Sequence, residues 1–225
     1  MSDLKPQEIQ RLDAACRDIF AIPTLLLMEH ASLALVRAAE DLLPRGGRIL
    51  ALCGAGHNGG DAAATARHLF NRGRDVEAIF VGVRAAEPAA DHEVNFEILR
   101  RLGVPWQSST DAAWIASRAR EASLVVDGLV GTGLSGALRP PLHGILEALA
   151  QAPPRSLAVD IPSGLSGLTG DPMPLALPAE VTVTLGFTKS GFTNPAAQPY
   201  LGRLIVADIG YPRPLREKPR AYLSR

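Results

Sequence analysis

The sequence predicts an α/β protein in which helices cover both faces of a mostly parallel sheet. Short apolar runs alternate with segments of helical periodicity along the chain, which indicates strands separated by helices. The apolar runs contain few polar residues, as is typical of parallel strands buried on both faces. Glycine-rich turns follow several of these runs, and open α/β sheets bind ligands at the edge where such turns lie.

The size and composition of the chain fit one globular domain. Its 225 residues suffice for one well-cored α/β unit, so we expect residues 1–225 to form a single domain, with 213–225 as a loosely held tail. Apolar residues make up 47% of the chain and charged residues 20%. Lys plus Arg and Asp plus Glu number 23 each, a balance that does not favour nucleic acid or a membrane surface as partner.

The cysteines and the apolar stretches predict a cytoplasmic location. Cys16 falls on an expected helix and Cys53 on an expected strand, so both are expected to be buried, reduced thiols. The N-terminal residues lack a basic segment followed by an apolar run. The longest apolar stretches, such as residues 22–28, are too short to span a membrane.

Two helices are expected before the first strand. The first has apolar residues at helical spacing, namely Ile9, Leu12, Cys16 and Ile19. The second is expected to start after Pro23, with Thr24 as its cap, and to run towards Leu43. Its apolar face would comprise Leu26, Leu27, Ala31, Ala34, Leu35 and Ala38.

An alternation of strands and helices follows. Strands are expected at residues 48–53, 76–83, 124–130, 157–161, 181–185 and 204–209, with a short edge strand at 105–108. Helices are expected at residues 61–71, 88–102, 112–122 and 142–150. Right-handed crossovers would bring the loops after Cys53, Val130 and Ile161 to one edge of the sheet.

The glycine-rich turn at residues 54–60 is the first candidate for chemistry. Gly54, Gly56 and Gly59 have the spacing of a dinucleotide-binding loop, in which backbone amides and a helix start approach a phosphate. The next strand ends in residues 80–83 without the acid that would hold a ribose hydroxyl. This absence counts against an ordinary NAD dehydrogenase.

Two side chains in the same segment carry oxygen atoms. Asn58 and Asp61 would suit a cation or a polar substrate. The alternative is a tight turn in which Asp61 only stabilises the start of the following helix.

Two further aspartates stand where apolar strands end. Asp127 precedes a second glycine-rich turn and would need a metal ion, amide groups or a substrate hydroxyl as partner, unless it only braces the loop. Asp160 and Ser163 lie in a stiff Pro- and Gly-containing turn. Asp160 is a candidate general acid or base, or else a structural turn residue. Lys189 follows a later strand and belongs either to the site or to the solvated surface.

These segments together resemble the NAD(P)H-hydrate epimerase family, also called the YjeF N-terminal domain family, over nearly the whole chain. The resemblance is carried by residues 22–29, 57–61, 127–133, 159–164, 189–191 and 206–210. It implies a three-layer α/β/α sandwich with a Rossmann-like sheet, often a homodimer. It also implies an isomerase that interconverts the two C6 epimers of NADHX and NADPHX, which are NADH and NADPH hydrated on the nicotinamide ring. A separate dehydratase would then restore the cofactor.

The resemblance also implies a set of site residues. A potassium ion would be bound by Asn58, Asp127 and Ser163. The catalytic residues would be Asp160 and Lys189. The substrate would contact His57, Asn58, Gly59, Gly60, Asp61, Gly131, Thr132, Gly133, Leu134, Ser135, Gly136, Ala137 and Asp160. His57 stands where the family usually has asparagine, and Ala62 where it usually has glycine.

The working hypothesis is proton transfer by Asp160 at the hydrated ring, with the potassium ion organising the loops. Two other functional classes stay open on the sequence alone. One is a non-catalytic nucleotide sensor or scaffold of the same fold. The other is an ordinary nicotinamide-dependent oxidoreductase.

Overall fold

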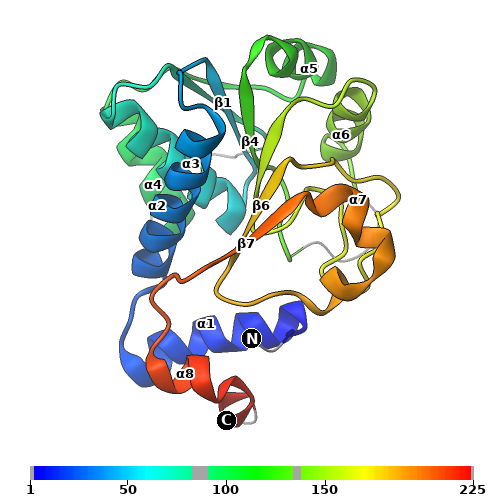
Figure 1. Cartoon of the computed structure of the whole chain (residues 1–225). Coiled ribbons are helices and arrows are strands. Elements are labelled where there is room, and N and C mark those ends of the chain that lie inside the picture. The colour runs from blue at the N-terminus through cyan, green and yellow to red at the C-terminus, as the bar shows by residue number, and fades with distance from the viewer. Residues whose placement is uncertain (1–2, 83–90, 134–137, 224–225) are drawn as a thin grey trace.

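The computed structural model describes residues 3–82, 91–133 and 138–223. Its centre is a sheet of seven strands in the order β3-β2-β1-β4-β5-β6-β7. Every neighbouring pair of strands is parallel. Helices cover both faces of this sheet (Figure 1). The structure therefore confirms the predicted three-layer α/β/α fold.

The strands are short and the longest helices lie early in the chain. The strands are β1 Ile49–Cys53, β2 Val76–Phe80, β3 Trp106–Ser108, β4 Leu124–Gly128, β5 Ser156–Val159, β6 Val181–Leu185 and β7 Arg203–Ala207. The α-helices are α1 Pro6–Phe20, α2 Thr24–Leu42, α3 His57–Asn71, α4 Asp91–Arg101, α5 Ala112–Glu121, α6 Leu142–Ala150, α7 Gln198–Leu201 and α8 Arg213–Glu217. Short 3₁₀ turns are η1 Ser190–Thr193, η2 Pro195–Ala197 and η3 Pro219–Tyr222.

The uniformly apolar sequence of β1 is explained by the helices on the two faces of the sheet. In β1, Ile49, Ala51 and Cys53 pack in the core formed with α1 to α4. Leu50 and Leu52 point to the other face, into the core formed with α5 and α6. Successive side chains of a strand alternate between the two faces. Because each face is covered by helices, no polar residue is needed on either side.

The sheet topology fixes where a ligand can bind. The chain runs from β1 outward to β2 and β3, and then returns to β4 on the other side of β1. The carboxyl ends of β1 and β4 thus lie side by side where the chain direction reverses. Ligands of open α/β sheets bind at this kind of position. Helix α1 lies across this end of the sheet, next to the C-terminal α8 and η3 (Figure 1).

Most element boundaries agree with the predictions, and those near the site differ most. Helix α3 begins at His57 rather than Asp61, so the turn after β1 is only three residues long. Thr24 is not a cap, because Pro23 occupies the cap position and the Thr24 hydroxyl donates a hydrogen bond to Asp91 instead. The predicted helix at 88–102 starts at Asp91 in the described part, and residues 83–90 lie outside it.

Two predicted core residues are exposed. Ile19 and Leu26 are 47% and 51% exposed, because they lie at the adjoining ends of α1 and α2 where little chain covers them. Cys16 and Cys53 are buried and unbonded, as predicted.

The segment predicted to be a loose tail packs against the domain within its described part, residues 213–223. Leu215 is fully buried in the same core as α1 and α2. The Phe20 and Tyr222 rings lie 5.9 Å apart between centroids. Nη1 of Arg11 donates a hydrogen bond of 3.2 Å to the carbonyl of Leu223. None of the helices in the described ranges is long and apolar enough to cross a bilayer.

Candidate functional site

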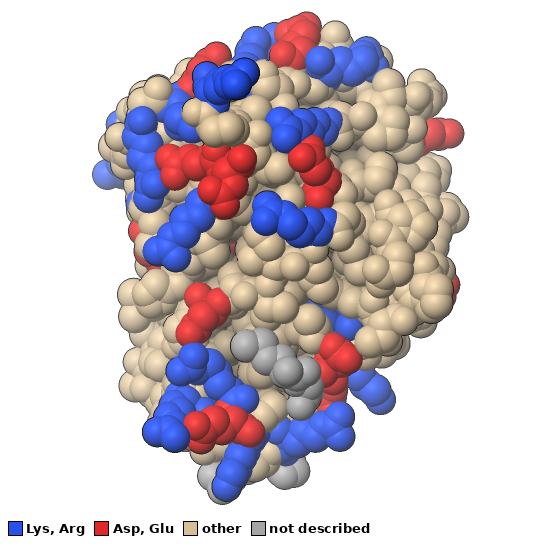
Figure 2. All heavy atoms as spheres, viewed as in Figure 1, with Lys and Arg blue, Asp and Glu red and all other residues tan. Residues whose placement is uncertain are grey.

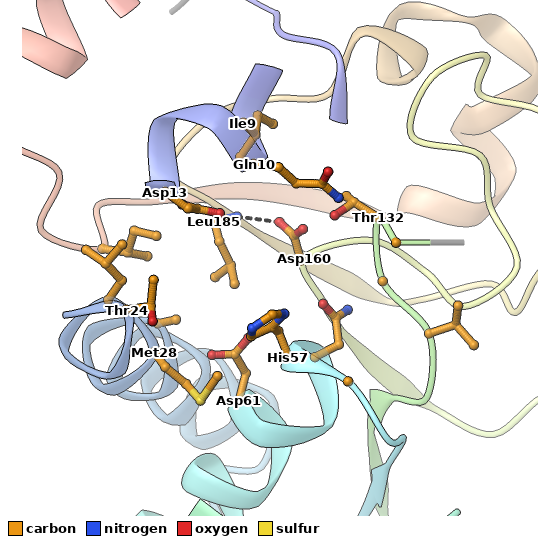
Figure 3. A pocket seen from close by; sticks show the side chains of 18 of the residues that line it. Ile9, Gln10, Asp13, Thr24, Met28, His57, Asp61, Thr132, Asp160 and Leu185 are labelled. Carbon is orange, nitrogen blue, oxygen red and sulfur yellow. Dashed lines mark hydrogen bonds between the residues drawn. The ribbon is translucent and has the colours of Figure 1, made fainter. Parts of the chain in front are cut away.

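A cavity of about 640 Å³ opens at the carboxyl edge of the sheet. Its walls come from α1, the starts of α2, α3 and α6, the loop after β4, the residue after β5, the last residue of β6 and two residues after β7. Figure 3 shows the labelled side chains of these elements around one common space. The cavity is therefore placed where the topology predicts a ligand.

The glycines after β1 allow the backbone to pack on itself. A Cβ atom on Gly59 would lie 1.8 Å from the carbonyl oxygen of Gly54, and one on Gly54 would lie 1.9 Å from that of Leu129. Gly56 has open space around it and lines the cavity. Gly54 thus packs the β1 loop against the β4 loop, and Gly59 packs the first turn of α3 against Gly54, which brings the start of α3 to the cavity.

The start of α3 provides amide groups on one wall. Gly56, His57 and Asn58 line the cavity, and the first amides of any α-helix have no partner within the helix. Next to them, residues 131–133 line the wall after β4. The predicted substrate contacts Leu134, Ser135, Gly136 and Ala137 lie outside the described residues.

Asp127 and Ser163 are joined directly beneath the cavity. Asp127 is 1% exposed, and it accepts hydrogen bonds from Oγ and N of Ser163 at 2.6 and 2.9 Å and from N of Leu129 at 3.3 Å. Burial raises the pKa of Asp127, and these hydrogen bonds oppose the rise. No ion pair among the described residues involves Asp127. A buried carboxyl group with only neutral partners is costly unless it is protonated or has a cation nearby.

Asn58 belongs to the same cluster of oxygen atoms. Its Nδ2 donates a hydrogen bond of 2.6 Å to the carbonyl of Val159. A Cβ on Gly131 would lie 2.1 Å from Oδ1 of Asn58, so this oxygen packs against the loop after β4. Oγ of Ser163 accepts a 3.0 Å hydrogen bond from N of Val130 in the same loop. The structure thus brings the three predicted potassium ligands around one loop.

This donor set fits a hard cation. It offers one carboxylate, an amide oxygen and a hydroxyl, and oxygen ligands of this kind suit cations of the alkali and alkaline-earth groups. The described ranges contain no group of three or more His, Cys, Asp or Glu side chains that would bind a transition metal.

Asp160 is fixed in an unusual backbone conformation at the cavity. Its φ of 65° is in the left-handed region, which is strained for a residue other than glycine. Oδ1 accepts a hydrogen bond of 2.8 Å from N of Leu185 and one of 3.3 Å from Oγ1 of Thr184, both on β6. The carboxyl group lines the cavity (Figure 3). The strain and the hydrogen bonds together hold this group in one position.

Lys189 lies behind Asp160 rather than in the cavity. It is fully buried, so it is not a solvated surface lysine. Its Nζ forms an ion pair with Oδ1 of Asp160, and it donates further hydrogen bonds to Oγ1 of Thr184 at 2.7 Å and the carbonyl of Phe187 at 3.2 Å. Lys189 is absent from the residues that line the cavity. Its position suits support of the Asp160 carboxylate rather than contact with a ligand.

Asp61 faces the cavity from α3. It is 4% exposed, and its Oδ1 has no hydrogen-bond partner among the described residues. Burial raises the pKa of Asp61 well above its ordinary value, and repulsion from Asp160 and Asp13 raises it further. An unpartnered polar atom on a cavity wall is available to a ligand.

The sequence analysis missed Asp13 and Tyr211. Both line the cavity, and the Tyr211 hydroxyl donates a hydrogen bond to Oδ1 of Asp13. Burial raises the pKa of Asp13 to about 6, although the hydrogen bond from Tyr211 opposes the rise. The sequence contained one indication of Asp13, namely a charged residue on an apolar helix face. Asp13 lies four residues after Ile9, so it shares the apolar face of α1. Tyr211 follows the last strand in a segment without a motif.

A sequence model of the YjeF-related protein N-terminus family matches residues 24–191. The chain belongs to this family. Within it, the chain is 34% identical to the NAD(P)H-hydrate epimerase of Rhodopirellula baltica, over 92% of this chain and 83% of the relative. It is also 34% identical to the NAD(P)H-hydrate epimerase of Limosilactobacillus fermentum, over 83% of this chain and 86% of the relative.

Longer members of the YjeF-related family are also similar. The bifunctional NAD(P)H-hydrate repair enzyme Nnr of Pyrobaculum aerophilum is 37% identical over 85% of this chain. The chain spans only 38% of the length of that relative. The crystal structure of yeast ynu0 (YNL200c) superimposes with a TM-score of 0.76 at 21% identity, covering 85% of this chain and 83% of the yeast chain. This structural likeness supports the fold.

Proposed function

We propose that the chain is an NAD(P)H-hydrate epimerase, an isomerase that interconverts the two C6 epimers of NADHX and NADPHX. The relatives of similar length that carry this name support the proposal. The observation that carries it is the arrangement of the cavity, where Asp61 and Asp160 face one space next to the free start of α3.

Different parts of the cavity suit the pyrophosphate and the hydrated ring of such a substrate. The pyrophosphate would lie between the start of α3 and residues 131–133, because helix-start amides favour anions. The hydrated ring would lie near Asp160, which projects from β5 into the cavity. Inversion at C6 requires a bond to that carbon to break and re-form on the other face. Each event moves a proton at the ring hydroxyl, and the Asp160 carboxylate would accept and return it.

A potassium ion is part of the proposal. Asn58, Asp127 and Ser163 would bind it below the cavity, where the buried Asp127 carboxyl has only neutral hydrogen-bond donors. When bound, the ion would supply positive charge next to the pyrophosphate and hold the loops after β1, β4 and β5 in register.

The biological setting is proposed on the same basis. The S epimer would pass to a separate NAD(P)HX dehydratase, a coupling supported by the bifunctional relatives named repair enzymes. A homodimer and a cytoplasmic location stay predictions. In the view of Figure 2, basic and acidic side chains are interspersed, in agreement with the balanced charge of the chain.

The test measures epimer interconversion directly. Purified R and S epimers of NADHX are incubated with the protein and separated by chromatography, with the spontaneous rate subtracted. We expect the wild type to accelerate interconversion, and Asp160→Asn to lower kcat by about 10²–10⁴-fold because the proton acceptor is lost. Asp41→Asn, an exposed carboxylate on α2 outside the cavity, is the matched control.

Two results would contradict the proposal. A wild type that binds NADHX without accelerating epimerisation would indicate a sensor or scaffold. Hydride transfer to common aldehydes at a higher rate than epimerisation would indicate an oxidoreductase.

A further inference from the structure

We propose that Asp13 is a second catalytic residue of the epimerisation, acting as the proton donor opposite to Asp160, and that Tyr211 positions it. This inference rests on the proposed function. It concerns two residues outside the stretch that matches the family model, residues 24–191.

The geometry places Asp13 at the reacting end of the cavity. Asp13 projects from α1, and Asp160 from the end of β5, into the same part of the cavity (Figure 3). The negative charge of Asp160 raises the pKa of Asp13. The oxygen on C6 and the ring nitrogen N1 are bonded to the same carbon. Two carboxyl groups that face one small space are therefore suited to serve both atoms.

The two carboxyl groups have opposite environments. Asp160 forms an ion pair with the buried Lys189 and accepts hydrogen bonds from β6. Within the described part of the chain, Asp13 forms no ion pair, and its side chain accepts a hydrogen bond only from the neutral Tyr211 hydroxyl. Burial raises the pKa of Asp13 to about 6. Carboxyl groups whose surroundings differ in this way can serve as acid and base at the same pH.

The chemical step balances with these two groups. The Asp160 carboxylate accepts the proton of the C6 hydroxyl while the bond from C6 to N1 breaks. The electron pair of that bond goes to N1, which takes a proton from the Asp13 carboxylic acid, and C6 becomes an aldehyde carbon. After rotation about the bond from C5 to C6, N1 attacks the opposite face of the aldehyde. The two protons then return to the groups from which they came.

Tyr211 sets the position and acidity of Asp13. Its ring packs on Phe187 with centroids 5.3 Å apart, which fixes its hydroxyl towards α1. The hydrogen bond that it donates stabilises the Asp13 carboxylate and so lowers the pKa of Asp13 against the effect of burial. The titratable groups that face Asp13 or are coupled to it are Tyr211, Asp61, Asp160, Lys189, His57 and Cys16.

The first test removes the proposed donor. Asp13→Asn keeps the shape of the side chain, and we expect kcat for NADHX epimerisation to fall about 10²–10⁴-fold with KM nearly unchanged. Thermal unfolding verifies that the variant is folded, and Asp41→Asn is the control. A folded Asp13→Asn protein with kcat within about threefold of wild type overturns the role of Asp13 and leaves the proposed function intact. A wild type without epimerase activity overturns both.

The second test is the pH profile of Tyr211→Phe. Because the donor must be protonated, we expect wild-type kcat to fall as the pH rises above about 6. Loss of the Tyr211 hydroxyl raises the pKa of Asp13, so this decline should move to higher pH while the low-pH plateau is kept. Tyr200→Phe, on a tyrosine outside the cavity, should leave the profile unchanged. A decline that stays at the wild-type pH in Tyr211→Phe overturns the proposal.

Discussion

Asp61 combines two properties that rarely coexist in a stable core: it is buried, and one of its carboxyl oxygens has no partner in the described part of the chain. Burial and the repulsion from Asp160 and Asp13 raise its pKa well above the ordinary 3.8. Such a group costs stability and persists where a ligand uses it. A protonated Asp61 would offer the substrate a hydrogen-bond donor.

This reasoning predicts how the stability of the protein depends on pH. Above pH 3.8 the unfolded chain releases the Asp61 proton while the folded protein retains it, so wild-type stability falls as the pH rises towards the folded-state pKa. Asp61→Asn has no titrating carboxyl group at this position, so its stability lacks this dependence on pH. We expect the melting temperature of the variant to lie roughly 2–4 °C above that of wild type at pH 8, with a gap that shrinks towards pH 4. Melting curves across this range provide the measurement, and a gap independent of pH would contradict it.

At the scale of elements, the contact between the β1 and β4 loops forms the floor of the site. Gly54 allows this contact because a methyl group there would meet the Leu129 backbone, and Gly59 lets the first turn of α3 pack on Gly54. Ala62 on α3 is fully buried, and a Cβ on Gly128 would lie 2.5 Å from the Ala62 methyl group. The glycine at 128 therefore leaves the space that the Ala62 methyl occupies.

Substitution by alanine is expected to change the stability of the protein in opposite directions at two glycines that lie in helices. Gly59→Ala places a Cβ against the backbone of Gly54, so we expect destabilisation by about 1–3 kcal/mol and weaker nucleotide binding. Gly144→Ala lies in α6 with nothing within 4 Å of its Cβ, and we expect it to stabilise by about 0.5–1 kcal/mol. Chemical denaturation of both variants gives the comparison. A stabilising Gly59→Ala would show that the first turn of α3 can move away from Gly54.

The elements could be predicted from the sequence largely because the strands are apolar on both faces and the helices are periodic. The strand at 181–185 and the helix at 142–150 were predicted with their observed boundaries. The start of α3 was placed four residues late, because glycines at 59 and 60 were taken to continue the turn. Packing against His92, Met28 and the Gly54 backbone makes these glycines necessary inside the helix.

Only the site residues that belong to a motif following a strand could be predicted from the sequence. Asp160 and Asn58 line the cavity as expected, whereas Asp127 and Ser163 lie beneath it and Lys189 behind it. Depth below a cavity depends on tertiary packing, which residue spacing does not reveal. Asp13 was missed for the same reason, since only the position of α1 across the sheet edge turns its apolar face towards the site.

At the scale of the whole molecule, one cation is expected to stabilise together the start of α3, the end of β4 and the loop after β5, which carry Asn58, Asp127 and Ser163. We predict that wild type melts higher in KCl than in tetramethylammonium chloride at equal ionic strength. At a potassium concentration of about 100 times the dissociation constant, binding would stabilise the folded protein by roughly 2.7 kcal/mol. Asp127→Asn should abolish the difference, and Asp41→Asn should retain it. Equal melting of wild type in both salts would exclude a potassium site.

Asp13 and Tyr211 come from opposite ends of the sequence, yet they meet through one hydrogen bond on the same wall. In a recombinant with a single crossover between positions 13 and 211, Asp13 comes from one parent and Tyr211 from the other. Hybrids assembled from two homologues that differ at these positions are therefore expected to lose activity unless both ends derive from one parent.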